Sequence, residues 1–262
     1  MVVWGKQNRS DSMSTLLLRL AAPMQSWGVG SKFNNRMTNR EPTRSGVIGM
    51  VACAMGIRRD DSLGELEELR FGVRIDQPGE LQRDFQMVHQ EEGIKGNPWL
   101  TYRYYLNDAV FLVALDGADS LLTRIEEALY HPAFPIFLGR MSCPPVGELC
   151  LGIRQMSFME ALRQEKWQAA SWYQKKMRFR RPKSLEIVRD AVDGEEGYTV
   201  RDVPESFSRK HRIYNWRNVV REHLPLDLIC TELNRDDVIS TDHNPMELLE
   251  EYDVSIENTD KS

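Results

Sequence analysis

The first 155 residues alternate strand-like and helix-like hydrophobic patterns in a fixed order. Apolar residues at every second position predict a strand with one buried face, whereas apolar residues three and four positions apart predict a helix. The predicted elements, in chain order, are a strand at 15–20, a helix at 43–55, a half-buried strand at 71–75, a central strand at 109–115, a helix at 119–130 and a strand at 147–154. This β-α-β-β-α-β order predicts an α+β domain with a ferredoxin-like fold, the pattern shared by RNA-recognition domains.

A long segment, residues 77–107, separates the second predicted strand from the third. It is too long for an ordinary connection between neighbouring strands, and it is rich in Gln, His, Tyr and Arg. Loops of this length in compact domains are usually functional or disordered. We therefore interpret residues 77–107 as an insertion into the domain.

The rest of the chain changes character after the last predicted strand. A helix is predicted at 158–176, followed by strand-like segments at 185–189 and 198–203. At the other end, Met13 offers an alternative start. The predicted divisions are an N-terminal extension at 1–13, the ferredoxin-like domain at 14–155, a smaller, irregular, β-rich C-terminal subdomain at 156–224 and a flexible acidic tail at 225–262.

The formal net charge of −5 is an average over two unlike parts. Residues 231–262 contain ten acidic residues against Arg235 and Lys261, a net charge of −8, so the rest of the chain carries +3. A mildly basic body can bind a phosphate backbone through local clusters, but it does not suit indiscriminate coating of nucleic acid. The run from Lys175 to Lys183 is the densest cluster, and it suits either a nucleic-acid backbone or a protein-docking face.

The composition, 41% hydrophobic and 28% charged, is that of an ordinary globular protein. The longest apolar run, residues 47–57, is too short to span a bilayer, and the N-terminus has no apolar signal core. We therefore expect a cytoplasmic protein with no membrane partner. The four cysteines are widely spaced without the paired spacing of a metal site, so we expect reduced thiols, no metal and no cofactor.

Polar and aromatic residues follow directly after the first predicted strand, at Gln25, Ser26 and Trp27. An indole at the end of a sheet can stack on an unpaired base, and an amide can bond a base edge. The same indole can instead fill the rim of the core, with its N–H satisfied inside the protein. Residue types alone leave both roles open.

Two further segments have the composition of phosphate sites. Thr43, Arg44 and Ser45 begin a helix, where backbone N–H groups, hydroxyls and a guanidinium can bind phosphate, although a plain N-cap needs only one hydroxyl. In the loop at 139–144, glycine admits a close backbone and Arg140 offers a bidentate donor fork. We expect both segments to contact phosphate. The alternative for the loop is a tight turn before two prolines.

His89 raises the question of catalysis. A metal-independent ribonuclease needs a base near the 2′-hydroxyl and an acid or cation at the leaving oxygen. His89, with Tyr102 or Tyr104 and Lys95, supplies such groups within the insertion. A single histidine in a polar insertion is more often a contact residue, so we expect no catalytic residue. A metal-independent endoribonuclease stays the alternative.

Six sequence motifs occur in order within residues 14–221: MQSWG at 24–28, PTRSGVIGM at 42–50, RDFQMVH at 83–89, YRYYLNDA at 102–109, FLGRMSCP at 137–144 and RDVP at 201–204. In this order they resemble the CasD family of the RAMP superfamily, subunits of the type I-E CRISPR surveillance complex called Cascade. The ordered co-occurrence of six motifs is far more specific than any one of them.

The resemblance implies a non-catalytic subunit that binds the five-prime handle of the CRISPR RNA (crRNA), while a separate subunit, CasE, cuts the precursor. It implies that the insertion forms a hairpin-like thumb. It also implies two protein partners, the backbone subunit CasC and the large subunit CasA, with target DNA nearby in the complex. The residues expected to contact RNA are Gln25, Ser26, Trp27, Arg40, Thr43, Arg44, Ser45, His89, Tyr102, Arg103, Gly139, Arg140, Met141 and Ser142.

Overall fold

The computed structural model describes residues 14–28, 34–88, 99–177, 182–208 and 210–226. The expected N-terminal extension, His89, nearly all of the acidic tail and part of the basic run at 175–183 lie outside the described residues. The elements are β1 (Thr15–Ala21), β2 (Met24–Gln25), β3 (Asn35–Arg36), α1 (Arg44–Ala54), η1 (Gly64–Glu68), β4 (Arg70–Gln77), β5 (Glu80–Val88), β6 (Trp99–Asn107), β7 (Val110–Asp116), α2 (Asp119–Tyr130), β8 (Cys150–Arg154), α3 (Phe158–Gln164), α4 (Ser171–Lys176), β9 (Ser184–Asp190), β10 (Tyr198–Phe207) and β11 (Arg212–Pro225).

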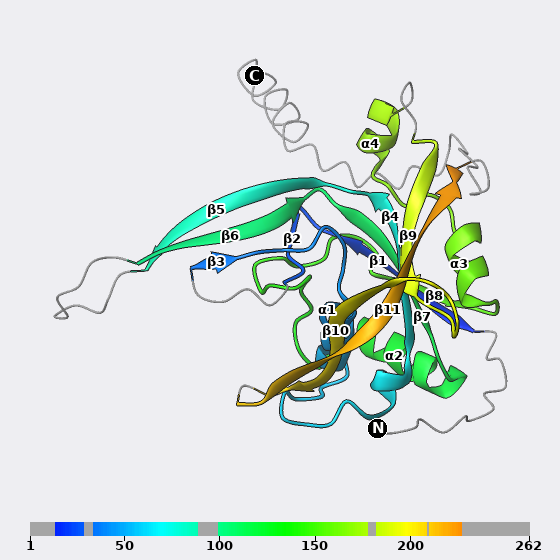
Figure 1. Ribbon diagram of the computed structural model, residues 1–262, viewed down its shortest axis with the longest axis horizontal. Helices are drawn as coiled ribbons and strands as arrows, with labels where there is room; N and C mark the ends of the chain where they lie inside the picture. Colours follow the sequence, from blue (N-terminus) through cyan, green and yellow to red (C-terminus); the bar gives the residue numbers. More distant parts are fainter. Residues whose placement is uncertain (1–13, 29–33, 89–98, 178–181, 209, 227–262) are drawn as a thin grey trace, which may run out of the picture.

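Seven strands form one antiparallel sheet in the spatial order β10-β11-β9-β4-β7-β1-β8 (Figure 1). β7 pairs along its whole length with β1 on one side and with β4 on the other. Every residue of β7 except Asp116 is buried, because protein covers both faces of the sheet at this point. This double burial explains why the sequence of β7 is an almost continuous apolar run.

Side chains of β1 divide the core between the two faces of the sheet. Leu16, Leu18 and Leu20 pack with α1 and α2, whereas Leu17 packs with α3 on the opposite face. This division follows from the strand geometry, in which successive side chains point to opposite faces. The four leucines are all fully buried, so β1 needs an apolar residue on each side.

Most elements of the first domain are confirmed. The helices predicted at 43–55 and 119–130 and the strands predicted at 15–20 and 109–115 correspond to α1, α2, β1 and β7. Thr43 is the N-cap of α1, since its side chain accepts a hydrogen bond from the backbone N–H of Gly46. The β-α-β-β-α-β order is present as β1, α1, β4, β7, α2 and β8.

The prediction of a half-buried strand at 71–75 is wrong, because both faces of β4 are covered. Arg74 and Asp76 lie on the side that the alternating pattern assigned to solvent, yet they are 0% and 1% exposed. Arg74 Nε donates to Asp76 Oδ1 at 2.6 Å, and Arg74 Nη2 donates to Asp76 Oδ2 at 2.9 Å. The two charges are buried together because each satisfies the other.

The single helix predicted at 158–176 is also wrong, because the chain forms two short helices, α3 and α4, with a non-helical connection. Three backbone carbonyls between residues 162 and 166 accept hydrogen bonds from the guanidinium of Arg74. The backbone N–H of Gln168 donates to Asp76 Oδ2 at 2.6 Å. The buried pair therefore binds the backbone of the connection to β4, an arrangement that helical periodicity cannot reveal.

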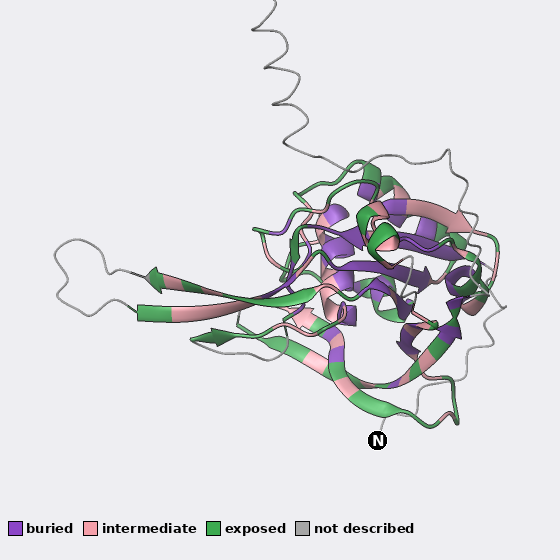
Figure 2. Ribbon diagram, turned by 90° about the horizontal axis from the view of Figure 1, so that it is seen from above, coloured by how far each residue is buried: buried purple, intermediate pink, exposed green. Residues whose placement is uncertain are grey.

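β5 and β6 form a long antiparallel hairpin inside the predicted insertion, and the hairpin projects from the body of the molecule (Figure 1). At its base, β6 also pairs with β2 and β3, which makes a second sheet of four strands. Figure 2 shows the hairpin as largely exposed beside the buried strands of the main sheet. The projecting part therefore presents both of its faces to possible partners.

The C-terminal segment, expected as a subdomain, contributes its strands to the main sheet. β9 pairs with β4 between Gly72 and Ile75, and β11 pairs with both β9 and β10. The segment is rich in strands, but these strands extend the sheet of the first domain. As a result, β10 lies against α1, a contact between distant parts of the chain.

Candidate nucleic-acid interface

The motif at Gln25–Trp27 is buried at the end of β1. Gln25 Nε2 donates to the carbonyls of Leu20 and Ala109, and Gln25 Oε1 accepts from Trp27 Nε1 at 3.2 Å. Trp27 is 1% exposed, so its ring has no free face for a base. Of the two roles that the sequence left open, the structure therefore shows the core role for Trp27.

Gly46 provides the space that the Trp27 ring occupies. A Cβ at position 46 would lie 2.8 Å from Cε3 of Trp27, closer than real Cβ contacts. Tryptophan and glycine thus fix the distance between the segment after β1 and the first turn of α1. This packing positions the loops around Trp27.

Two of the backbone donors at the start of α1 have side-chain partners within the protein. Thr43 Oγ1 accepts from the backbone N–H of Gly46 at 3.2 Å, and the backbone N–H of Arg44 donates to Asp202 Oδ2 at 2.8 Å. Asp202, from β10, takes the place that the sequence suggested for a phosphate at this helix start. Ser45 Oγ lies 3.4 Å from Thr43 Oγ1 and belongs to the same local group.

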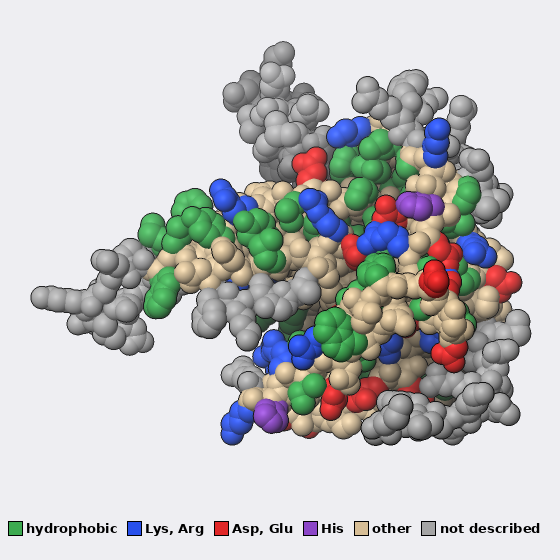
Figure 3. Space-filling model, viewed as in Figure 1, with side chains coloured by type: hydrophobic (Ala, Val, Ile, Leu, Met, Phe, Trp, Pro, Cys, Tyr) green, Lys and Arg blue, Asp and Glu red, His purple; other side chains and the backbone are tan. Residues whose placement is uncertain are grey.

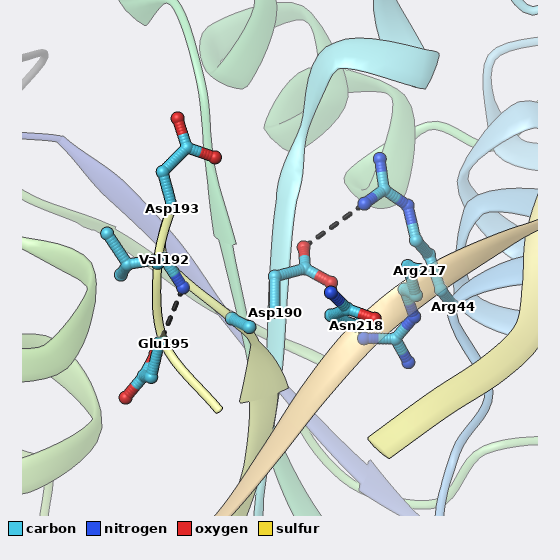
Figure 4. A pocket seen from close by; sticks show the side chains of 9 residues that line it. Arg44, Asp190, Val192, Asp193, Glu195, Arg217 and Asn218 are labelled. Atoms are coloured by element: carbon cyan, nitrogen blue, oxygen red, sulfur yellow. Dashed lines mark hydrogen bonds and ion pairs between the residues drawn. The ribbon is translucent and has the colours of Figure 1, made fainter. Parts of the chain in front are cut away.

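The Arg44 side chain belongs to a network of internal ion pairs (Figure 4). Arg44 Nη1 contacts Asp190 Oδ2 at 3.1 Å, while Arg217 contacts Asp190 Oδ1 at 2.7 Å and both carboxylate oxygens of Asp202. Burial lowers the pKa of Arg44, and the neighbouring Asp190 opposes that shift. The adjoining pocket, about 390 Å³, is also lined by Asp193 and Glu195, so its surface does not favour an anion.

The loop that follows Phe137 is docked against the motif after β1. Gly139 has φ +86°, and a Cβ at this position would lie 1.7 Å from the carbonyl oxygen of Ser26. The backbone N–H of Ser26 donates to the carbonyl of Leu138 at 3.2 Å. Only glycine permits this approach, and the approach brings Arg140 to the base of the hairpin.

Arg140 meets β6 at the base of the hairpin. Its guanidinium carbon lies 4.6 Å from the centroid of the Tyr105 ring, and its Nη2 donates to the carbonyl of Arg36 at 2.9 Å. Arg140 Nη1 and Arg103 Nε are buried nitrogen atoms without a hydrogen-bond partner among the described residues. Buried N–H groups are normally paired, so two such donors on neighbouring cations indicate a site for an anionic acceptor.

The neighbouring side chains change the pKa of the Tyr105 hydroxyl. Burial acts to raise its pKa, but the neighbouring polar side chains of Arg140 and Ser142 and the charge of Arg140 outweigh burial, so the pKa of Tyr105 is lowered. We call Arg103, Tyr105, Arg140 and Ser142 the arginine cluster. It combines cationic donors with a hydroxyl pair, the groups that proteins use to bind phosphate and sugar oxygens.

Exposed residues surround the arginine cluster. Met141 is 86% exposed, Arg36 is exposed on β3, and Arg40 and Ser142 are exposed on loops. Tyr102 is half-buried on the opposite face of β6, outside this rim, with the guanidinium carbon of Arg83 5.2 Å from its ring centroid. The rim of the cluster is therefore polar and basic, and it is open to a ligand.

Cross-strand pairing divides the hairpin into two unlike faces. Arg103 and Tyr105 share the face of the polar β5 residues, since Arg103 pairs with Asp84 and Tyr105 with Gln82. The opposite face carries exposed hydrophobic side chains at Leu81, Phe85, Met87 and Leu100. Figure 3 shows hydrophobic side chains gathered over the hairpin. One face thus suits nucleic acid and the other suits protein.

The structure gathers only part of the predicted site. Arg103, Gly139, Arg140 and Ser142 lie together, whereas Thr43, Arg44 and Ser45 lie with the carboxylates of the C-terminal strands. Tyr105 was missed, although a period of two places it on the same strand face as Arg103. Arg36 contributes a carbonyl, and no side-chain motif could have indicated that.

No group of three His, Cys, Asp or Glu side chains in the described part of the chain is placed to hold a metal ion. Cys143 and Cys150 are free and buried, and burial raises the pKa of each thiol. Neutral buried thiols are poor nucleophiles. Across the described ranges, no helix combines the length and apolar character needed to cross a membrane.

Comparisons with known proteins confirm the resemblance given by the six motifs. A family model described as CRISPR-associated protein (Cas_Cas5) matches residues 15–220. The CRISPR system Cascade subunit CasD of Escherichia coli (strain K12) is 39% identical over 166 residues, which cover 55% of this chain and 73% of that protein.

Two solved structures also match this chain. The first, "Crystal structure of Cas protein", has a TM-score of 0.64 and 34% identity, over 82% of this chain and 97% of that chain. The second, "CRISPR RNA-guided surveillance complex", has a TM-score of 0.66 and 33% identity, over 82% of this chain and 92% of that chain. The mixed α+β fold is therefore shared with Cas proteins.

Proposed function

Because this chain belongs to the Cas5 family of CRISPR-associated proteins, we propose that it is a non-catalytic RNA-binding subunit of a Cascade-type surveillance complex. Its ligand is crRNA, and the part it binds is the single-stranded five-prime handle. An unpaired strand exposes bases, sugar hydroxyls and phosphates together, so one protein surface can read all three. In this scheme base pairing reads the target sequence, while protein fixes the end of the guide.

The arginine cluster carries this proposal. Arg140 Nη1 and Arg103 Nε are buried donors without a partner among the described residues, and both lie at the base of an exposed hairpin. A phosphate oxygen of the handle satisfies such donors with charge-assisted hydrogen bonds. Contacts are assigned to these two arginines, to Arg40 and to the loop at 139–142. His89, which lies outside the described residues, and Tyr102, on the opposite face of β6, are further proposed contacts.

The buried members of the predicted site have a supporting role. Gln25, Ser26 and Trp27 hold the loop at 139–142 in place through their packing. Thr43, Arg44 and Ser45 join α1 to the C-terminal strands. These residues position the RNA contacts without touching RNA themselves.

The strand order supports a finer assignment of the fold. β4-β7-β1-β8 are adjacent in the sheet, and α1 and α2 pack on the same face. We assign these elements to a ferredoxin-like unit of the RRM and RAMP type, with the β5–β6 hairpin as its thumb. The apolar face of the thumb suits the backbone subunit CasC, because exposed hydrophobic patches mark docking surfaces. CasA occupies a flank of the body, and target DNA passes nearby in the assembled complex.

The test is a titration of the full chain with labelled guide RNA in chelator-containing buffer, using native and scrambled handles. Native RNA is expected to bind more tightly and stay intact. Arg140→Ala is expected to weaken binding by about 1–3 kcal/mol, because a charge-assisted contact is lost, and the difference should shrink as salt rises. Arg124→Ala, an exposed arginine on α2, is the matched control and should bind like the unchanged chain.

Three results would contradict this proposal. Unchanged affinity in Arg140→Ala would remove the arginine cluster from the RNA site. Equal binding of native and scrambled handles would assign handle specificity to the assembled complex. Site-specific cleavage in chelator would favour the metal-independent endoribonuclease that processes repeat RNA, and His89 would become the first residue to test.

A further inference from the structure

The ribbon formed by β10 and β11 exposes an aromatic side chain beside a cation. Trp216 is 63% exposed. Arg201 is its cross-strand partner, and the guanidinium carbon of Arg201 lies 5.9 Å from the Trp216 ring centroid. Arg201 Nε donates to the carbonyl of Tyr214 at 3.0 Å, while its two terminal nitrogens have no hydrogen-bond partner among the described residues. The pair is therefore held in place with donors still available.

The residues that follow Arg201 and Trp216 in sequence indicate which way these two side chains point. Asp202 and Arg217 point into the protein, where Arg217 donates to both carboxylate oxygens of Asp202 and to Asp190 Oδ1. The register of β10 shifts after Arg201, so the direction follows from β11, where Trp216 precedes the inward Arg217 in alternation and points outward. Arg201 pairs directly with Trp216 and is exposed beside it. The internal ion pairs thus hold an aromatic ring and a cation on the outer face of the ribbon.

The ribbon is basic within an acidic chain. Residues 198–221 contain six basic and two acidic residues, a formal net charge of +4, whereas the whole chain carries −5. Arg221 pairs with Glu41 and Glu186, so it does not add free charge. Lys210 and Arg212 are exposed near the turn, and Figure 3 shows basic side chains at this end of the ribbon.

We propose that the outer face of the β10–β11 ribbon is a second contact surface for single-stranded RNA. An unpaired base stacks on Trp216, while Arg201 and Arg212 contact the neighbouring phosphates. Aromatic rings flanked by cations are the usual composition of single-strand binding surfaces. RNA fits better than an apolar protein face, because Ile213 and Trp216 are separated by polar residues and lie on a basic ribbon.

This inference rests on the proposed function, because the RNA is the same guide strand. The end of the ribbon extends to the same side of the molecule as the β5–β6 hairpin (Figure 1). In this proposal a strand bound at the arginine cluster continues to the ribbon. Two separated contacts would fix the direction of the strand as well as its position.

The experiment compares guide-RNA affinity of the full chain with that of Trp216→Ala and Trp216→Phe. Trp216→Ala is expected to lose roughly tenfold in affinity, because base–aromatic stacking is lost, and Trp216→Phe is expected to retain most of it. Trp172→Ala, which removes another exposed tryptophan on α4, is the control and should bind normally. Thermal unfolding of each variant checks that the fold is intact.

Arg140→Ala is measured in parallel, which separates this inference from the proposed function. Weaker binding in Trp216→Ala supports the ribbon, and with Arg140→Ala unchanged it would also remove the arginine cluster. Unchanged binding in Trp216→Ala with weaker binding in Arg140→Ala would overturn the ribbon alone. Absence of RNA binding in the unchanged chain would overturn both. Normal RNA affinity with failed assembly in Trp216→Ala would make the ribbon a protein-docking face.

Discussion

Gly139 shows how one residue determines the geometry of the arginine cluster. Its φ of +86° and its contact with the Ser26 carbonyl together exclude any side chain. Gly194 has the same φ of +86°, but no heavy atom lies within 4 Å of the position its Cβ would take. Comparing alanine substitutions at the two positions therefore separates two losses of stability: the one from backbone conformation and the one from the close approach to Ser26.

Gly139→Ala is expected to destabilise the protein by more than Gly194→Ala. The conformational cost of alanine at positive φ is about 1–2 kcal/mol at either site. At position 139 the loop must also move away from Ser26, so guide-RNA affinity is expected to fall as Arg140 shifts. Denaturant unfolding and RNA titration of both variants check this. Equal losses of stability and unchanged RNA binding would show that the close approach does not position Arg140.

At the scale of elements, one buried ion pair connects the sheet to the segment between α3 and α4. Arg74 and Asp76 lie on β4 and together bind three backbone groups of that segment and the carbonyl of Leu162 in α3. Trp167 Nε1 also donates to the carbonyl of Asp76 at 2.8 Å. These bonds satisfy both charges inside the core and determine where α3 ends.

Asp76→Ala is expected to cost about 3–5 kcal/mol of unfolding free energy, because it leaves the Arg74 guanidinium buried without its carboxylate. Replacing both residues by leucine should cost less than the sum of the two single changes, since no charge is then stranded. Arg124→Ala breaks an exposed pair with Glu65 and should change stability by less than about 1 kcal/mol. Strict additivity of the two leucine changes in urea unfolding would contradict this account.

At the scale of the whole molecule, charge is unevenly distributed along the chain. The segment at 231–262 carries −8 and the remainder carries +3. Both the arginine cluster and the β10–β11 ribbon belong to the basic remainder. The acidic segment therefore opposes the approach of RNA to the same molecule, through a field that salt screens.

Replacing the ten acidic residues of 231–262 by their amides is expected to raise guide-RNA affinity at low salt, because the net charge then changes from −5 to +5. The gain should decrease steadily with ionic strength. Deletion of the same segment should give a similar gain, which controls for chain length. A gain that persists at high salt, or one given by deletion alone, would indicate a steric effect instead of an electrostatic one.

Elements whose causes are local can be predicted from the sequence alone. The apolar run of β7, the Thr43 cap and the helical spacing of α2 are each encoded within a few residues, so periodicity predicted them. The six ordered motifs also identified the family from sequence, because each motif is a short run of neighbouring residues. The two faces of the hairpin also follow from the sequence, because alternate residues of β5 and β6 point to opposite faces.

Which polar residues are free to bind depends on contacts that form only in the folded protein. Arg44 looked like a phosphate ligand, but its partners Asp202 and Asp190 are 158 and 146 positions away in sequence. The alternating pattern placed Arg74 in solvent, but the connection after α3 covers β4 there. For Trp27 the sequence left stacking and core packing open, and the space at Gly46 decides for the core. The physical reason is that the cost of burying a charge or an indole depends on partners brought by distant segments, and local sequence does not record them.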